Sequence, residues 1–338
     1  MANHRYSISD IAGMLGVSKS TVSRAVNGKR GVSEELREKI LELVDEVGYR
    51  PSTLAQGLYK GRVNIVTLIV GDIRNPFYAA LVFNIQRILI RHNYMVMTFN
   101  SEYDVQRELE FVELTLQFNF AGLILITAQT ESMKNKLNSI DIPKVLVNRN
   151  FPSYDGDYVL ADNFQAGYRA AMHLIDLGHQ RIGFVRGPGL STASSQRFEG
   201  FKQALKNYNL QLYDEYIFDS DLKMETGSAL AEKFSKLEKY PSAMVIVNDM
   251  TSIGFIDGCR ERGIRVPEDL SIVSFDNIDL ASVKGIELTT IDQHVDQMSE
   301  HAARMILKQL EGEKETKPER IILEPTLIIR KTTMPCSE

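Results

Sequence analysis

The sequence predicts a small all-α domain at the N-terminus, followed by a larger α/β region. Three observations lead to this fold class. Apolar residues recur with a helical period before residue 50, and buried-strand runs alternate with helical stretches after residue 60. In addition, a chain of 338 residues with 43% hydrophobic and 25% charged residues can bury the cores of two or three domains.

The first helices have the pattern of a helix-turn-helix. Ser7 can cap the first helix and is followed three residues later by an acid, which is a capping-box pattern. Apolar side chains at helical spacing give this helix one buried side: Ile8, Ile11, Ala12 and Leu15. Gly16 suits the turn, and Ser18 can cap the second helix. A third helix is expected to start at Ser33 and to end near Gly48.

The second helix lies within SKSTVSRAVN (18–27) and has one apolar side and one side of short polar and basic residues. Such a side can approach a DNA groove. Residues 1–33 carry five Lys or Arg and one acid, whereas the whole chain has a net charge of −5. A basic N-terminal segment on an acidic chain indicates affinity for phosphates. The candidate DNA contacts are Ser18, Lys19, Ser20, Thr21, Arg24 and Asn27.

We expect Lys19 and Ser20 to contact bases in the major groove. Thr21 and Arg24 are placed for bases or nearby phosphates, and Asn27 is placed for the DNA backbone. The alternative is a small helical bundle that binds protein or nothing, with these residues as solvated surface. The clustering of polar residues on the second helix disfavours that alternative.

The region after residue 60 alternates strands and helices. Strand-like runs lie at 64–70, 94–99, 121–127, 144–148, 181–187, 243–248 and 270–275. Helical stretches separate most of them, at 77–93, 105–118, 162–177, 196–208, 224–238 and 250–263. This alternation favours parallel sheets with crossover helices, and the length of the region suggests two lobes.

Other patterns limit the function classes. No apolar run approaches the ~20 residues that cross a bilayer, and the first residues lack the apolar stretch of a signal peptide. The two cysteines and six scattered histidines give no disulfide framework and no metal or cofactor site. A Rossmann-type enzyme is the first rival, but the loop RGPGLSTAS (186–194) lacks the glycine spacing of nucleotide-binding motifs. We therefore expect a cytoplasmic protein that is not an enzyme, without catalytic residues.

Several motifs occur in order along the chain. The first segment, from Tyr6 to Leu58, contains IxDIAxMLGVSKSTVSRAVNG, VSEELREKILELVDEVGYRP and AQGL. The others are DIRNPFY (72–78), ADN (161–163), LGHQRIGFVRGP (177–188), RFEGF (197–201), NDMTSIG (248–254), VPEDLSIVSFDN (266–277), LTTIDQ (288–293) and LIIRKTT (327–333). Together they resemble the lactose/galactose repressor (LacI/GalR-type) family of bacterial transcription regulators.

The resemblance implies a domain organisation. A helix-turn-helix domain would span 1–50, a hinge helix or linker 51–61, and a two-lobed, periplasmic-binding-protein-like effector domain 62–338. The first lobe would hold roughly 62–160 and 292–320, and the second roughly 161–291 and 321–335, so that three segments cross between them. No leucine-heptad tail follows LIIRKTT, so we expect a homodimer, with the helix at 77–93 and the strand after Gly122 as interface segments.

The hinge would be the second DNA element. In the family, this segment folds when two subunits bind DNA, and a leucine from each inserts into the minor groove; Leu58 matches that position. Gly57 departs from the family pattern and should make folding of the hinge harder by roughly 1 kcal/mol. The alternative for this segment is a plain linker.

The effector site would lie in the cleft at the carboxyl ends of the strands. DIRNPFY supplies Asn75, Phe77 and Tyr78, whose amide and rings suit sugars. By resemblance, further side chains project into the cleft: Arg149, Asn163, Arg197, Asn248, Asp249 and Asp276. Arg197 and Asp276 could clamp a polyhydroxylated ligand, whereas Asp249 could instead cap the helix that follows it.

Two positions depart from the family pattern in this region. Leu222 lies where some relatives have an aromatic residue that stacks on the ligand, which disfavours a purine and leaves a sugar, sugar acid or sugar phosphate. His294 stands where proline is frequent, and the sequence assigns it no effect.

The sequence therefore predicts a sequence-specific DNA-binding regulator, a repressor of carbohydrate-metabolism genes controlled by a small sugar-like effector. Its partners would be operator DNA with an inverted repeat, the effector, and a second copy of the chain, without a membrane. Induction is favoured over corepression. The second rival is a cytosolic ligand-binding protein of the same fold that does not bind an operator.

Overall fold

The computed structural model describes residues 6–49, 62–126, 130–151, 154–312 and 317–336. The chain divides into two compact units, Met1–Val63 and Asn64–Glu338. In the described residues, no helix combines the length and hydropathy needed to span a membrane.

The described residues of the first unit form three helices, α1 (Ile8–Leu15), α2 (Lys19–Val26) and α3 (Glu34–Glu46). The capping box predicted at Ser7 is present, and Gly16 ends α1 in the left-handed conformation with φ of 65°. Ser18 caps α2 by accepting a hydrogen bond from the Thr21 backbone N–H. The buried core consists of Ile11, Ala12, Val22, Ala25, Ile40 and Val44. The helix-turn-helix predicted from the sequence is therefore present.

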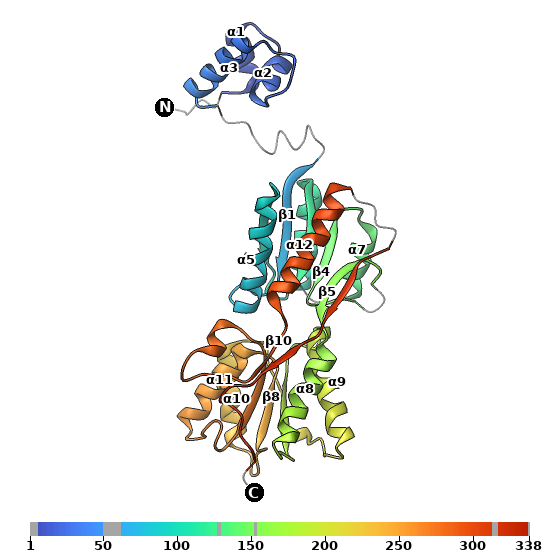
Figure 1. Ribbon diagram of the computed structural model, residues 1–338, viewed down its shortest axis with the longest axis vertical. Coiled ribbons are helices and arrows are strands. Elements are labelled where there is room, and N and C mark those ends of the chain that lie inside the picture. Colours follow the sequence, from blue (N-terminus) through green and yellow to red (C-terminus); the bar gives the residue numbers. More distant parts are fainter. Residues whose placement is uncertain (1–5, 50–61, 127–129, 152–153, 313–316, 337–338) are drawn as a thin grey trace. The chain divides into compact units, whose positions relative to one another are not determined.

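The second unit contains two six-stranded sheets, each flanked by helices (Figure 1). The first lobe is built on the sheet β11-β5-β4-β3-β1-β2. Its strands are β1 (Val63–Val70), β2 (Met95–Asn100), β3 (Phe120–Ile126), β4 (Lys144–Val147), β5 (Asp157–Ala161) and β11 (Arg320–Leu323). Its helices are α5 (Pro76–Arg91), α6 (Val105–Gln117), α7 (Glu131–Ser139) and α12 (Val295–Glu311).

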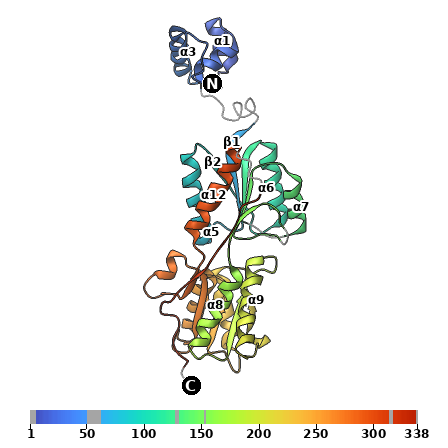
Figure 2. The ribbon, with the colours of Figure 1, turned by 45° about the vertical axis from the view of Figure 1, so that its right-hand side comes forward.

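The second lobe is built on the sheet β12-β10-β9-β8-β6-β7. Its strands are β6 (Ile182–Arg186), β7 (Ile217–Asp219), β8 (Ala243–Ile246), β9 (Ser271–Asp276), β10 (Thr290–Asp292) and β12 (Thr326–Ile328). Its helices are α8 (Asn163–Asp176), α9 (Thr192–Asn207), α10 (Met224–Ser235) and α11 (Asp249–Glu261), with short 3-10 turns at Asp214–Tyr216 and Asp279–Ser282. Figure 2 shows α8 and α9 side by side. Four of the strand pairs are parallel, and only β12 pairs antiparallel, with β10.

Three segments of chain connect the lobes, following β5, β10 and β11. The last of these corrects the expected boundary at residue 320, because β11 (Arg320–Leu323) pairs with β5 and so belongs to the first sheet. A hydrogen bond joins the first crossing to the third, because the Asp162 N–H donates to the Leu323 carbonyl (2.9 Å). Arg169 of α8 also donates to the Pro325 carbonyl in the third crossing (2.6 Å).

His294 lies in the second crossing segment with φ of 56° and ψ of 56°. A proline could not adopt this conformation, because its ring holds φ near −65°. The His294 ring contacts the Thr326 hydroxyl at 3.0 Å and so joins the second crossing to the third. The histidine thus gives this segment a backbone geometry that a proline would exclude.

Two expectations about elements need correction. Helix α9 begins at Thr192 rather than 196, because Ser191 caps it by accepting a hydrogen bond from the Ser194 N–H. The strand after Gly122 cannot form a subunit interface, because β3 lies between β4 and β1 and is buried along its whole length. Helices α7 and α12 were not predicted from the sequence.

The C-terminal tail is held to the second lobe by two histidines. His179 is 3% exposed, and its ring bonds to the Ser242 hydroxyl (2.9 Å) and the Met334 carbonyl (3.1 Å). His173 contacts the Thr333 hydroxyl at 3.0 Å. Burial lowers the pKa of both imidazoles below the ordinary value of 6.5.

We expect the second unit to lose stability as the pH falls below 6.5. There the unfolded chain takes up protons that buried His173 and His179 resist, so the free energy of unfolding decreases. Urea unfolding on both sides of this pH measures the slope. His179→Gln should flatten it, whereas His92→Gln on the exposed end of α5 should leave it unchanged. An unaltered slope in the His179 variant would show that another group is responsible.

Candidate functional site

The polar residues of α2 share one side of the helix. Lys19, Ser20, Ser23, Arg24 and Asn27 are spaced so that they fall on one face, opposite Val22 and Ala25 in the core. The side chains of Lys19, Ser20, Arg24 and Asn27 are exposed. This arrangement leaves a short, basic helix face open to a groove.

Several of these side chains already form local hydrogen bonds. The Ser18 hydroxyl bonds to the hydroxyls of Ser20 (2.7 Å) and Thr21 (2.8 Å). Arg24 donates from Nε to the Ser20 carbonyl (3.1 Å), and Asn27 donates to the Ser23 carbonyl (2.7 Å). The Arg24 side chain would therefore have to break its hydrogen bond to the Ser20 carbonyl to reach a base. Leu58 and the hinge at 51–61 lie outside the described residues, so the wedge stays a prediction.

A cavity lies between the lobes of the second unit, at the carboxyl ends of the strands. Seven of the nine expected effector contacts line it: Asn75, Phe77, Tyr78, Arg149, Arg197, Asn248 and Asp276. Leu222 also lines it. Its volume is about 20 Å³, which holds about one water molecule. A sugar would therefore require these walls to move apart.

Arg197 is positioned by two helices and a strand end. It lies on α9, which packs closely on α8 because Gly167 of α8 has no side chain. A Cβ at this position would lie 1.9 Å from the Arg197 carbonyl oxygen. Its Nε donates to Asn163 Oδ1 (2.9 Å), and one Nη donates to the Val247 carbonyl (2.6 Å). Its guanidinium also stacks over the Phe275 ring, 4.6 Å from the centroid. These contacts fix the guanidinium at the cleft.

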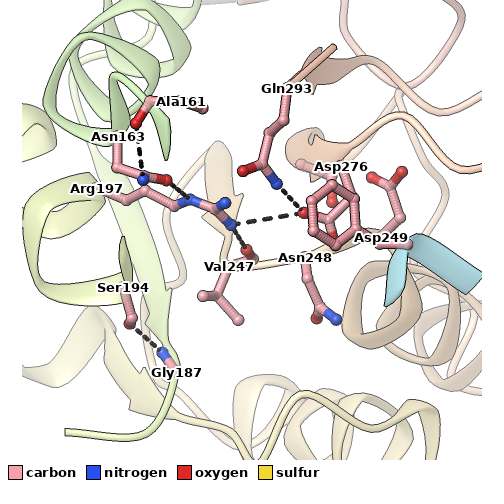
Figure 3. A network of polar contacts seen from close by, with 12 residues as sticks. Ala161, Asn163, Gly187, Ser194, Arg197, Val247, Asn248, Asp249, Asp276 and Gln293 are labelled. Atoms are coloured by element: carbon pink, nitrogen blue, oxygen red, sulfur yellow. Dashed lines mark hydrogen bonds and ion pairs between the residues drawn. The ribbon is translucent and has the colours of Figure 1, made fainter. Parts of the chain in front are cut away.

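Asp276 faces Arg197 from the end of β9. The two side chains form an ion pair of 3.7 Å, and Gln293 donates to the same carboxylate oxygen (Figure 3). Asn148 of the first lobe in turn donates to Gln293 (3.2 Å), so a polar chain joins the lobes. Burial raises the pKa of the Asp276 carboxyl above its ordinary value, and the charge of Arg197 opposes that rise.

The first lobe contributes aromatic and basic groups. Asn75 caps α5, and its side chain accepts a hydrogen bond from the Phe77 N–H at 3.0 Å. The Tyr78 hydroxyl accepts a hydrogen bond from Arg149 (2.9 Å). Arg149 is 5% exposed. Opposite charges, hydroxyl acceptors and ring faces together suit a small polyhydroxylated molecule.

Two expected contacts do not line the cavity. Asn163 lies behind Arg197 and orients it, bonding also to the Ala161 carbonyl (3.1 Å). Asp249 is fully buried, and its carboxylate accepts hydrogen bonds from the Ile278 N–H (2.9 Å) and the Thr290 hydroxyl (2.7 Å). The cap of α11 is Asn248 rather than Asp249. Both residues therefore support the site from behind.

Other lining residues were not expected from the sequence: Asn148, Ser191, Ala193, Ser194, Val247 and Gln293. Gln293 ends the motif LTTIDQ, and its place in a crossing segment could have indicated a role at the cleft. Ser194 supports the loop before α9 by accepting a hydrogen bond from the Gly187 N–H (2.8 Å). Among the described residues, no group of three or more His, Cys, Asp or Glu could hold a metal ion.

Comparisons with known proteins agree with this architecture. Residues 7–52 match the model of the bacterial regulatory proteins of the lacI family, and residues 171–333 match the periplasmic binding protein-like domain. The NTD biosynthesis operon regulator NtdR of Bacillus subtilis (strain 168) is 35% identical over 326 residues, which cover 96% of this chain and 99% of NtdR.

Two solved structures share the fold over nearly the whole chain. The transcriptional regulator CelR in complex with cellobiose has a TM-score of 0.72 and 26% identity, with 97% of this chain and 100% of that chain covered. The lac repressor dimer bound to operator and the anti-inducer ONPF has a TM-score of 0.84 and 23% identity, with 98% and 100% covered. The α-helical first unit and two-lobed second unit, with relatives similar over their full length, place this chain in the lacI family of bacterial regulatory proteins.

Proposed function

We propose that this protein is a sequence-specific repressor of carbohydrate-metabolism genes, whose affinity for its operator is controlled by a small sugar-like effector. The observation that carries the proposal is the presence, in one chain, of an exposed basic face on α2 and a polar cleft organised by Arg197 and Asp276. The first would bind operator DNA, and the second would bind the effector.

The effector would act by shifting a conformational equilibrium. The cavity holds about one water molecule, so a sugar would favour an arrangement in which its walls are further apart. Typical coupling of about 1–3 kcal/mol would change operator affinity ~5–150-fold. We propose induction, in which the effector releases DNA.

The side chains that line the cleft indicate the chemical class of the effector. Leu222 gives the cleft an aliphatic wall in place of an aromatic one, while Arg197, Asp276 and Asn248 offer charges and amides that pair with hydroxyls. A sugar, sugar acid or sugar phosphate fits these groups better than a flat purine does. CelR, a structural relative, binds cellobiose.

A homodimer is the proposed assembly. Exposed apolar side chains gather on α5 and the adjacent edge strand β2, where Phe83 is 62%, Ile90 55% and Met95 62% exposed. Such a patch is typical of a protein interface. Two copies would present two α2 helices to an inverted repeat. We further propose that the protein has no enzymatic activity and that it acts in the cytoplasm, where its operator DNA lies.

The first experiment is affinity selection of genomic DNA fragments with the purified full-length protein, followed by footprinting of the enriched fragments. A protected inverted repeat with a kinkable centre is expected, beside genes of one carbohydrate pathway. Sugars of that pathway should then release the protein from it. If no site is enriched with or without added sugars, the chain is a ligand-binding protein without an operator, and the repressor proposal fails.

A further inference from the structure

A second cavity adjoins the Arg197–Asp276 cleft and shares two of its lining residues, Arg149 and Ser191. We infer that it is a second compartment of the effector site and that the effector is a glycoside, a sugar joined to a second ring, rather than a free monosaccharide. The inference rests on the proposed effector control and narrows its ligand class.

The compartment has room for a ring that the inner cavity lacks. Its volume is about 290 Å³, against about 20 Å³ for the inner cavity. Tyr103 of the first lobe forms one wall, and the loop 188–191 of the second lobe forms another. The walls are largely apolar, from an aromatic ring, a proline and Leu190, which suits the apolar face of a sugar or an aryl group.

The Tyr103 ring is held in place at a conformational cost. A Cβ on Gly71 would lie 2.1 Å from the ring, so only glycine leaves room for it there. Glu102 and Tyr103 both have positive φ, 54° and 62°. Left-handed non-glycine residues cost roughly 1–2 kcal/mol each and persist where other contacts require them. The backbone is therefore strained at the point where it delivers Tyr103 to the compartment.

Arg149 supplies the polar contact. Its guanidinium lies over the Tyr103 ring, 5.7 Å from the centroid, and one Nη donates to Tyr78. Arg149 lines both compartments, so a ligand that spans them would lie against this positively charged side chain.

Shared walls connect the two compartments into one binding site. Arg149 and Ser191 line both, so a ligand held by Arg197 and Asp276 at one end can reach Tyr103 and Leu190 at the other. A free monosaccharide would fill only one end of this site. The second ring therefore distinguishes the preferred effector from its parent sugar.

The test compares free sugars with their glycosides on the full-length protein. Glucose, galactose, mannose and ribose are each paired with a disaccharide and a nitrophenyl glycoside, and the melting temperature and the affinity are measured. For the sugar that is recognised, we expect the glycoside to bind about tenfold or more tightly than the free sugar, from the added ring contacts. Equal affinity of sugar and glycoside would overturn the inference.

Two variants locate the second ring. Leu190 is 55% exposed, and in Leu190→Trp the larger side chain should fill the compartment. The affinity of this variant for the glycoside should then fall to its affinity for the free sugar. Leu280→Trp, on an exposed leucine outside the cleft, is the matched control. Tyr103→Ala should weaken binding of the glycoside by about tenfold, whereas Tyr103→Phe should bind it with unchanged affinity, because it keeps the ring.

The outcomes separate this inference from the proposed function. If Leu190→Trp and Tyr103→Ala both bind the glycoside as tightly as the wild type does, the cavity is not a second compartment of the effector site. Control of operator binding by a sugar would not be affected by that result. A wild-type protein that binds none of the sugars or glycosides overturns the sugar-like effector itself, and the inference with it.

Discussion

Arg197→Ala is expected to abolish the effector response and to leave operator affinity unchanged. Arg197 lies in the second unit, whereas the candidate DNA contacts lie in α2 of the first. In the cleft its guanidinium is held by Asn163 and the Val247 carbonyl, so its remaining donors are fixed for a ligand. Loss of a charged, preorganised contact is expected to weaken effector binding by about 100-fold or more.

The variant also affects folding, and a second substitution separates the two effects. Without Arg197, the buried Asp276 loses its ion-pair partner, which typically costs about 3–5 kcal/mol. Because burial already raises the pKa of Asp276, the carboxyl can become neutral instead and reduce that cost. Adding Asp276→Asn should recover stability, since an amide carries no charge to leave unpaired, but the effector response should stay absent.

Operator binding by gel shift, with and without the active sugar, measures the response. Arg186→Ala is the matched control: this arginine lies on β6 of the same lobe and pairs with Asp219 at the surface, so its loss should change neither folding nor response. A normal response in a folded Arg197→Ala variant would remove Arg197 from the effector site.

The sequence predicted the fold where patterns were local. The capping box at Ser7 and the seven strand-like runs reappear as structure, because each depends on residues next to one another. Helix α12 (Val295–Glu311) was missed although it has an apolar side, and the antiparallel strand β12 was missed because three residues give no periodicity. The crossing segments came from the resemblance, since strand pairing between distant segments leaves no local pattern.

The candidate site was predicted only in part, again because the sequence shows local patterns and not contacts between distant residues. Arg197 and Asp276 stand in recognisable motifs, and both line the cleft. Asn163 and Asp249 also stand in motifs, but a motif does not say whether a polar side chain faces the ligand or supports one that does. The second cavity could not be predicted, because Tyr103 and Leu190 are distant in sequence and meet only when the lobes are assembled.

Lys19→Ala is expected to change which operator sequence is preferred. Lys19 is the first residue of α2 and is exposed, the position from which a recognition helix contacts base edges. A base contact is worth about 1–3 kcal/mol of discrimination, whereas a phosphate contact has no sequence preference. Selection from a randomised operator should therefore lose its preference at one base pair in each half-site.

The role of Lys19 is decided by comparison with an exposed cation outside α2. Arg30→Ala, in the exposed turn before α3, should weaken all sequences about equally and reduce the slope of affinity against salt by about one contact per subunit. Lys39→Ala is the control, because Lys39 lies on α3 and pairs there with Glu35. If Lys19→Ala behaves like Arg30→Ala, Lys19 contacts phosphate, and base recognition must come from Ser20 and its neighbours on the same face of α2.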